Sequence, residues 1–221
     1  MTGSSALIAN AADVERIERT PLAEQYRADS TYDMLRQAAT RFPGHDALVF
    51  VPKGSADEPP FVYSHAELLR RVTQAANLFH RLGVGPHDVV AYVLPNLPQA
   101  HFSLLGGQAA GIACAINPML EPEHLVQILR AAGARVLVTL SPGPGGELWD
   151  KMAAVVEQVP TLQTVLQVSL AQYLVPGFVP PAAGWPASHH HPPRPGGHRG
   201  GDGLLPRRLP GALVGEHRGL R

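Results

Sequence analysis

The stretch from Ser141 to Trp149, SPGPGGELW, is the best candidate in this sequence for holding a phosphate group. It is predicted to join a strand to the first turn of a helix, where free N–H groups suit an anion. However, the Lys of G-x-x-x-x-G-K-[ST] is absent, Leu148 stands at the last Gly of G-x-G-x-x-G, and two prolines remove N–H donors. We therefore interpret this stretch as a surface turn.

A histidine-rich stretch, HHHPPRPGGH, contains His189, His190, His191 and His198. Imidazole is a good ligand for Zn, Cu and Ni. Adjacent histidines on a flexible chain nevertheless have no fixed geometry and no outer hydrogen bonds to orient them. We expect adventitious metal binding at most, and no selected metal site.

The remaining candidates are single residues without partners at catalytic spacing. Cys114 lies in an apolar predicted strand, which favours a small core residue over a nucleophile. His101 and His124 lie on predicted helices and are interpreted as surface or boundary residues, because their spacing gives no Ser-His-acid order. Pro122 and Glu123 suit the first turn of a helix. We therefore predict no catalytic, cofactor-binding or metal-binding residue in this chain.

Composition limits the function classes. The 221 residues are 45% hydrophobic, which is enough for one core. The 18 basic and 18 acidic residues balance, so no overall field favours nucleic acid or an anionic membrane. One cysteine and an N-terminus without a signal sequence predict a cytoplasmic protein. The apolar stretch from Phe102 to Ile116 is too short to span a bilayer, and its Gly107 and Gly111 predict close packing.

From Thr31 to Val168, helix caps, apolar runs and Gly- or Pro-containing turns alternate regularly, and they predict the elements that would position any site. Thr31 is expected to cap a first helix, and Ser64 with Glu67 has capping-box spacing at the start of a longer one. Strands 47–51 and 61–63 are expected to form a hairpin with a wide loop. The predicted helices are 31–42, 64–83, 95–111, 121–133 and 146–159, and the further strands are 88–94, 112–116, 134–140 and 162–168. This alternation predicts an α/β fold with a doubly wound, mostly parallel sheet and flanking helices.

Two long blocks of this region resemble the N-terminal part of the AMP-forming, adenylate-forming enzymes. FVYSHAELLRRVTQAANLFHRLGVGPHDVVAYVLPNLPQA is similar to the family's opening block, and LLGGQAAGIACAINPMLEPEHLVQILRAAGARVLVT is similar to the block that follows. Asn117-Pro118, Glu123 and the run Arg135-Val136-Leu137-Val138 stand where that pattern has them. The leader before Thr31 and the segment TRFPGHDALVF resemble acyl-CoA synthetases most.

This resemblance implies a reaction in which a carboxylic or fatty acid and Mg·ATP form acyl-AMP and pyrophosphate, and CoA then displaces AMP. In the family a loop of the form S/T-S/T/G-G-T/S-T-G-x-P-K follows the matched region and holds the phosphates. This sequence contains neither that loop, nor the later acidic and arginine motifs, nor the domain with the catalytic lysine. The expectation is thus a fragment, inactive as this chain, that binds no ATP, Mg²⁺ or CoA by itself.

The composition changes after residue 175. The last 46 residues hold 9 of the 22 Pro, 10 of the 22 Gly and 5 of the 11 His, and such a segment is expected to be disordered. The predicted organisation is a leader (1–30), a partial AMP-binding domain (31–175) and a disordered tail (176–221). An arginine-rich, lysine-poor composition suggests GC-rich DNA and the hypothesis that a frameshift produced the tail.

Two other functions stay open at this point. The chain could be a stand-alone α/β binding or interaction module that pairs with another chain through an open sheet edge. It could also be a mononucleotide-binding Rossmann-like domain, which has the topology but lacks a fingerprint here.

Overall fold

A computed structural model describes residues 8–21, 24, 27–55, 57–143, 147–174 and 215–217. The helices are α1 (Ala11–Glu18), α3 (Thr31–Arg41), α4 (His65–Arg81), α5 (Pro98–Ala110), α6 (Pro122–Ala131), α7 (Glu147–Glu157) and α8 (Ala171–Leu174). The strands are β1 (Asp46–Phe50), β2 (Phe61–Ser64), β3 (Val89–Val93), β4 (Ile112–Ala115), β5 (Ala134–Leu140), β6 (Thr164–Val168) and β7 (Gly215–His217).

The main sheet has the strand order β4-β3-β5-β6-β7. Its first four strands are parallel, and β7 pairs antiparallel with β6. The chain runs outward from β3 to β4 and then crosses back to β5 and β6, so the sheet is wound in both directions. The predicted doubly wound, mostly parallel α/β fold is therefore confirmed.

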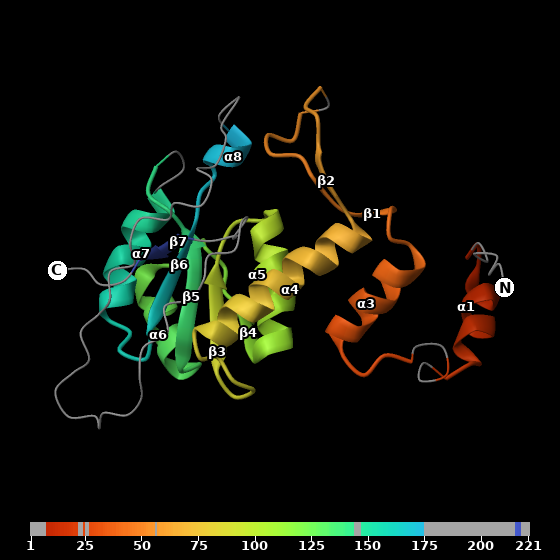
Figure 1. Ribbon diagram of the computed structural model, residues 1–221, viewed down its shortest axis with the longest axis horizontal. Coiled ribbons are helices and arrows are strands. Elements are labelled where there is room, and N and C mark those ends of the chain that lie inside the picture. The colour runs from red at the N-terminus through yellow and green to blue at the C-terminus, as the bar shows by residue number, and fades with distance from the viewer. Residues whose placement is uncertain are drawn as a thin grey trace.

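Each face of this sheet is covered by two helices, so its central strands are apolar on both sides (Figure 1). Helices α4 and α5 cover one face, where Val90, Val136 and Leu166 are buried. Helices α6 and α7 cover the other, where Ala91 and Leu137 are buried. Adjacent strand residues thus point into different cores, which is why the strands read as continuous apolar runs.

The predicted helix after Ser64 is present as α4. Ser64 is its N-cap, and its hydroxyl accepts a hydrogen bond from the N–H of Glu67 at 3.3 Å. The Glu67 carboxylate pairs with Arg70 and Arg71 instead of completing the predicted capping box. The expected apolar face is buried at Leu68, Val72, Ala75 and Phe79, whereas Leu78 and Leu82 are half-buried. Helix α4 packs against α5 and crosses it in Figure 1.

The predicted cap of the preceding helix is wrong by one residue. Ser30, not Thr31, is the N-cap of α3, and its hydroxyl accepts a hydrogen bond from the N–H of Asp33 at 3.1 Å. The reason is conformational, because Ser30 has extended backbone angles (φ −160°, ψ 164°) while Thr31 already belongs to the helix.

Small residues bring α5 close to its neighbours, as the sequence predicted for Gly107 and Gly111. A Cβ atom at Gly107 would lie 3.1 Å from the Cβ of Ala113, and one at Gly111 would lie 2.6 Å from the carbonyl oxygens of Asp88 and Gly85. Side chains there would push α5 away from the sheet, so the glycines serve close packing.

The hairpin β1–β2 is antiparallel, as predicted, and an aromatic side chain of α8 joins it to α5. Tyr173 of α8 makes edge-to-face contacts with Phe50 and Phe61, with ring centroids 5.0 and 4.9 Å apart. Its hydroxyl hydrogen-bonds the buried side chain of Gln99 in α5, with atom separations of 2.8 and 3.0 Å. One residue thereby joins three elements that are distant in sequence.

Of the predicted tail, only Gly215–His217 is described, and its backbone extends the sheet as β7. The sequence pattern did not indicate this strand. The rest of 176–221, including His189, His190, His191 and His198, lies outside the described residues, so the disorder and the adventitious metal binding expected there stay predictions.

Candidate functional site

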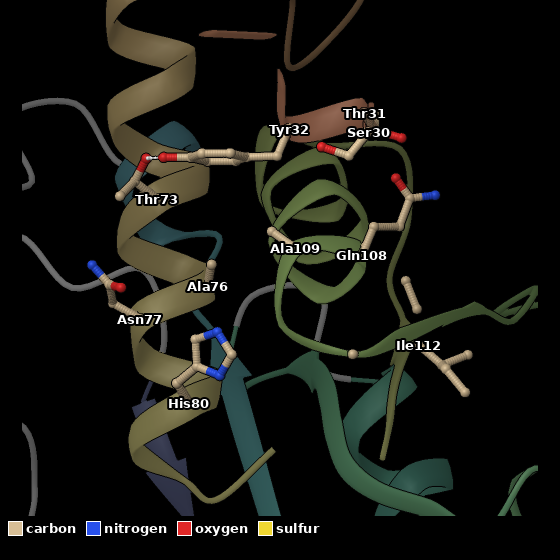
Figure 2. Close-up of a pocket in the computed structure, with 12 residues that line it drawn as sticks. Ser30, Thr31, Tyr32, Thr73, Ala76, Asn77, His80, Gln108, Ala109 and Ile112 are labelled. Atoms are coloured by element: carbon tan, nitrogen blue, oxygen red, sulfur yellow. Dashed lines mark hydrogen bonds between the residues drawn. The ribbon is translucent and has the colours of Figure 1, made fainter. Parts of the chain in front are cut away.

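A groove of about 800 Å³ lies between α4 and α5, and the start of α3 closes one end of it (Figure 2). Thr73, Ala76, Asn77 and His80 form one wall, because residues three and four apart share a face of α4. The end of α5 and the start of β4 form the opposite wall. Figure 2 shows Tyr32 reaching across from α3 to Thr73, and their hydroxyl oxygens are 2.8 Å apart.

The polar groups of this groove are mostly engaged in holding the fold. The Thr73 hydroxyl donates to the carbonyl of Leu69 at 2.7 Å, and the Ser30 hydroxyl caps α3. The His80 Nδ1 lies 3.1 Å from the carbonyl oxygen of Val84. No Asp, Glu, Lys, Arg or Cys is among the described residues that line the groove. It therefore lacks the carboxylate that would orient His80 as a base, and it offers no acid–base or nucleophilic pair.

A smaller hollow of about 310 Å³ lies at the carboxyl ends of β3 and β4, the edge at which doubly wound sheets commonly bind ligands. Its polar lining comes from Tyr92, Asn96, His101 and Asn117. The His101 Nδ1 is 3.3 Å from the carbonyl oxygen of Leu97, and burial raises the pKa of Tyr92. The hollow has polar walls but, among the described residues, no charged side chain.

The sequence placed His101 at a boundary, and its half-buried position confirms this. Sequence reasoning did not single out Asn96 or Tyr92 as lining a hollow. The available indication was position, because Asn96 and Asn117 each lie within three residues of the end of a strand of the parallel sheet, and such residues gather at the carboxyl ends of the strands.

The other candidate residues take structural or solvent-exposed positions. Cys114 is a free thiol on β4, half-buried rather than fully in the core, and burial raises its pKa. A raised thiol pKa lowers the thiolate fraction, so Cys114 is not an activated nucleophile. His124 is exposed on α6, while Pro122 and Glu123 occupy the first turn of that helix as predicted.

The Gly-rich turn is described at Ser141–Gly143 and from Glu147 onward, and residues 144–146 lie outside the described part. Glu147 and Asp150 occupy the first turn of α7. Two carboxylates at a helix N-terminus already interact with its dipole and repel a phosphate. This placement supports the interpretation of a surface turn.

The two sequence blocks that resemble the family meet at the amino ends of strands β3 and β5. The Asp88 carboxylate accepts a hydrogen bond from the N–H of Gly85 at 2.8 Å and pairs with Arg135 at 3.3 Å. These two interactions, the Gly85 hydrogen bond first, lower the pKa of Asp88. Gly83 has a left-handed backbone (φ +81°), and the Arg135 guanidinium lies 2.8 Å from where a Cβ there would be. Asp88 and Arg135 therefore tie β3 to β5.

Asn117 and Pro118 likewise shape a turn. The Asn117 side-chain oxygen accepts a hydrogen bond from the N–H of Met119 at 2.9 Å. Lys151 of α7 donates to the carbonyls of Pro118 at 2.7 Å and Leu120 at 3.0 Å. The turn before α6 is thus fastened to α7.

Similarity to known proteins agrees with this fold. The family of AMP-binding enzymes matches residues 35–196, which is more than half of the chain. The chain belongs to this family. A marinolic acid–CoA ligase from Pseudoalteromonas sp. (strain SANK 73390) is 34% identical over 161 residues, which cover 73% of this chain and 25% of that ligase. The 4-coumarate–CoA ligase 1 of Arabidopsis thaliana is 31% identical over 111 residues, or 50% of this chain and 19% of that ligase.

Solved structures give the same assignment. Acetoacetyl-CoA synthetase from Streptomyces lividans has a TM-score of 0.58 and 27% identity, and the match covers 67% of this chain and 23% of that one. A Mycobacterium tuberculosis fatty acyl CoA synthetase, with a TM-score of 0.54 and 24% identity over 65% of this chain and 27% of its own, shares the fold. The chain therefore spans about a quarter of the length of these relatives.

The described residues do not fit the groups that the family uses. No group of three or more His, Cys, Asp or Glu that could hold a metal ion occurs within the described ranges. Neither hollow contains a Lys or Arg among its described lining residues to neutralise phosphate. Among the described residues, the two hollows therefore offer no charged side chain for a nucleotide phosphate. A separate finding is that no described helix is long and apolar enough to cross a membrane.

Proposed function

We propose that this chain forms the first α/β subdomain of an acid–CoA ligase of the acyl-CoA synthetase kind. The reaction of such an enzyme converts a carboxylic or fatty acid, ATP and CoA into acyl-CoA, AMP and pyrophosphate. The observation that supports this is the 34% identity over 161 residues to a marinolic acid–CoA ligase. We leave the acid and its chain length open. The proposed location of the reaction is the cytoplasm.

The chain by itself is proposed to be catalytically inactive. The reaction needs cations and N–H donors around the phosphates. Among the described residues, the hydroxyls of the groove and the charged pair Asp88–Arg135 hold structure instead. ATP, Mg²⁺ and CoA would be bound by other parts of a complete ligase, and this subdomain would supply the scaffold on which they are built.

An assay of the purified 221-residue chain tests both statements. The chain is incubated with Mg·ATP, CoA and, in separate reactions, acetate, octanoate, palmitate or 4-coumarate, and pyrophosphate and thioester are measured. We expect no turnover above a reaction without protein, while the Arabidopsis 4-coumarate–CoA ligase 1 serves as the positive control with 4-coumarate. Far-UV circular dichroism of the same sample checks that it is folded. Turnover with any acid would show that the chain contains a working site.

A second function, a stand-alone interaction module, rests on the edge strand β4. This strand stands at one end of the order β4-β3-β5-β6-β7, so its outer edge has no partner strand in the described part of the chain. Exposed apolar side chains lie on and beside it, with Ile112 48% and Met119 82% exposed. Size-exclusion chromatography and pull-down discriminate the two functions: a stoichiometric partner favours the module, and aggregation favours the subdomain of a larger ligase.

A further inference from the structure

Two polar side chains near the carboxyl end of the main sheet are buried without hydrogen-bond partners. Thr139 of β5 is 0% exposed and Gln167 of β6 is 5% exposed. Within the part of the chain that the structure describes, neither the Thr139 Oγ1 nor the Gln167 Nε2 has a hydrogen-bond partner. Burial alone does not explain this, because the equally buried amide of Gln99 is paired with Tyr173.

The two side chains are neighbours. Thr139 and Gln167 are register partners in the parallel ladder of β5 and β6. Two residues earlier, Leu137 and Val165 are also register partners, and both belong to the core beneath α6 and α7. Side chains two apart in a strand share a face, so Thr139 and Gln167 point into the same interface. The unpaired Thr139 Oγ1 and the unpaired Gln167 Nε2 therefore lie on adjacent strands and on the same face of the sheet.

Such a pair is costly unless something binds to it. Each buried polar group without a partner lowers the folding equilibrium constant roughly fivefold to a hundredfold, so native proteins commonly satisfy these groups with an ordered water. We propose that one water molecule occupies the space between Thr139 and Gln167, where it accepts a hydrogen bond from the Gln167 amide and donates one to the Thr139 hydroxyl.

Three features favour water over another ligand. The unpaired Gln167 Nε2 can only donate, so its partner must accept, and the partner must also satisfy a hydroxyl. Both groups are neutral, which gives a charged ligand no counter-charge at this pair. Neither residue lines the groove or the smaller hollow, so neither of these two hollows opens onto the pair. Water is the smallest molecule with both an acceptor and a donor.

Nuclear magnetic resonance of the 221-residue chain tests the proposal directly. In the ¹⁵N-labelled protein we expect nuclear Overhauser cross-peaks between the Gln167 side-chain amide protons and a long-lived water. The sign of these cross-peaks should be that of a water molecule bound to the protein. The variant T139S keeps the hydroxyl and should retain these cross-peaks, while T139V should weaken or abolish them. A direct hydrogen bond between Gln167 and Thr139, without contact to water, would overturn the proposal.

Urea unfolding supplies a second measurement that does not depend on observing the water. T139V and Q167M each leave one group unpaired, and each should lower the folding equilibrium constant by about tenfold relative to the unchanged chain or to T139S. The double variant removes both polar groups and should recover most of that loss. Single variants as stable as the unchanged chain, or losses that simply add in the double variant, would count against a shared water.

Discussion

Replacing Tyr173 by Phe removes one oxygen atom from the contact that joins the hairpin to α5. The side chain is 8% exposed and its hydroxyl is bonded to Gln99, which is 3% exposed. The variant keeps the ring contacts with Phe50 and Phe61 but leaves a buried amide without its partner. An unpaired buried polar group costs about 1–3 kcal/mol, so we expect the free energy of unfolding to fall by about that amount.

Two further variants separate the hydrogen bond from the ring. Tyr173→Ala also removes the edge-to-face contacts, and large-to-small aromatic changes cost about 3–5 kcal/mol. The double variant Y173F/Q99M removes both polar partners and should be more stable than Y173F alone, because no buried amide remains unpaired. Urea unfolding followed by far-UV circular dichroism gives all of these values. If Y173F is as stable as the unchanged chain, the bond to Gln99 does not contribute and the reasoning fails.

Two other predictions concern close packing and a charged turn. Gly106→Ala places a Cβ 2.7 Å from the Cβ of Ala75, so α4 and α5 must move apart, and we expect a loss of about 1–3 kcal/mol in thermal or urea unfolding; Gly44→Ala, with nothing within 4 Å, is the matched control. The N–H of Gly85 and then the neighbouring guanidinium lower the pKa of Asp88 below its ordinary 3.8, so its contribution is present above that pH and is lost as the pH falls further. The stability difference between the unchanged chain and D88N should therefore shrink below pH 3.8, and a difference that persists or grows in acid would contradict the assigned pKa direction.

Local chemistry explains which parts of the fold could be predicted. The helix after Ser64 has a cap, a periodic apolar face and a glycine stop within 20 residues, so its start and its type follow from short-range physics. The strand Ala134–Leu140 was predicted with the observed bounds, because a mostly apolar run rich in β-branched residues lies between Gly133 and a Pro-containing turn in an alternating α/β chain. The error at Ser30 is of a different kind, since two neighbouring residues can both cap a helix and backbone angles decide between them.

The rest depended on contacts between residues distant in sequence. Gln99 and Tyr173 are 74 positions apart, and neither has a sequence pattern that indicates a buried hydrogen bond. The groove in Figure 2 combines one face of α4 with the first residues of α3, so it appears only once the helices are packed. The smaller hollow could be predicted in part, because Asn96 and Asn117 follow parallel strands. The contribution of His101 to its wall could not be predicted, because it depends on where α5 packs.

The residues that carry the family resemblance explain why it identifies the fold more firmly than an activity. Asp88 and Arg135 come from the two separate blocks, and their pairing holds β3 beside β5. Asn117 and the carbonyl of Pro118 form a turn that Lys151 fastens to α7. The roles of these residues in this structure are to hold strands and turns in place. A resemblance that rests on such residues therefore points to the fold, and we expect residues outside them to select the substrate.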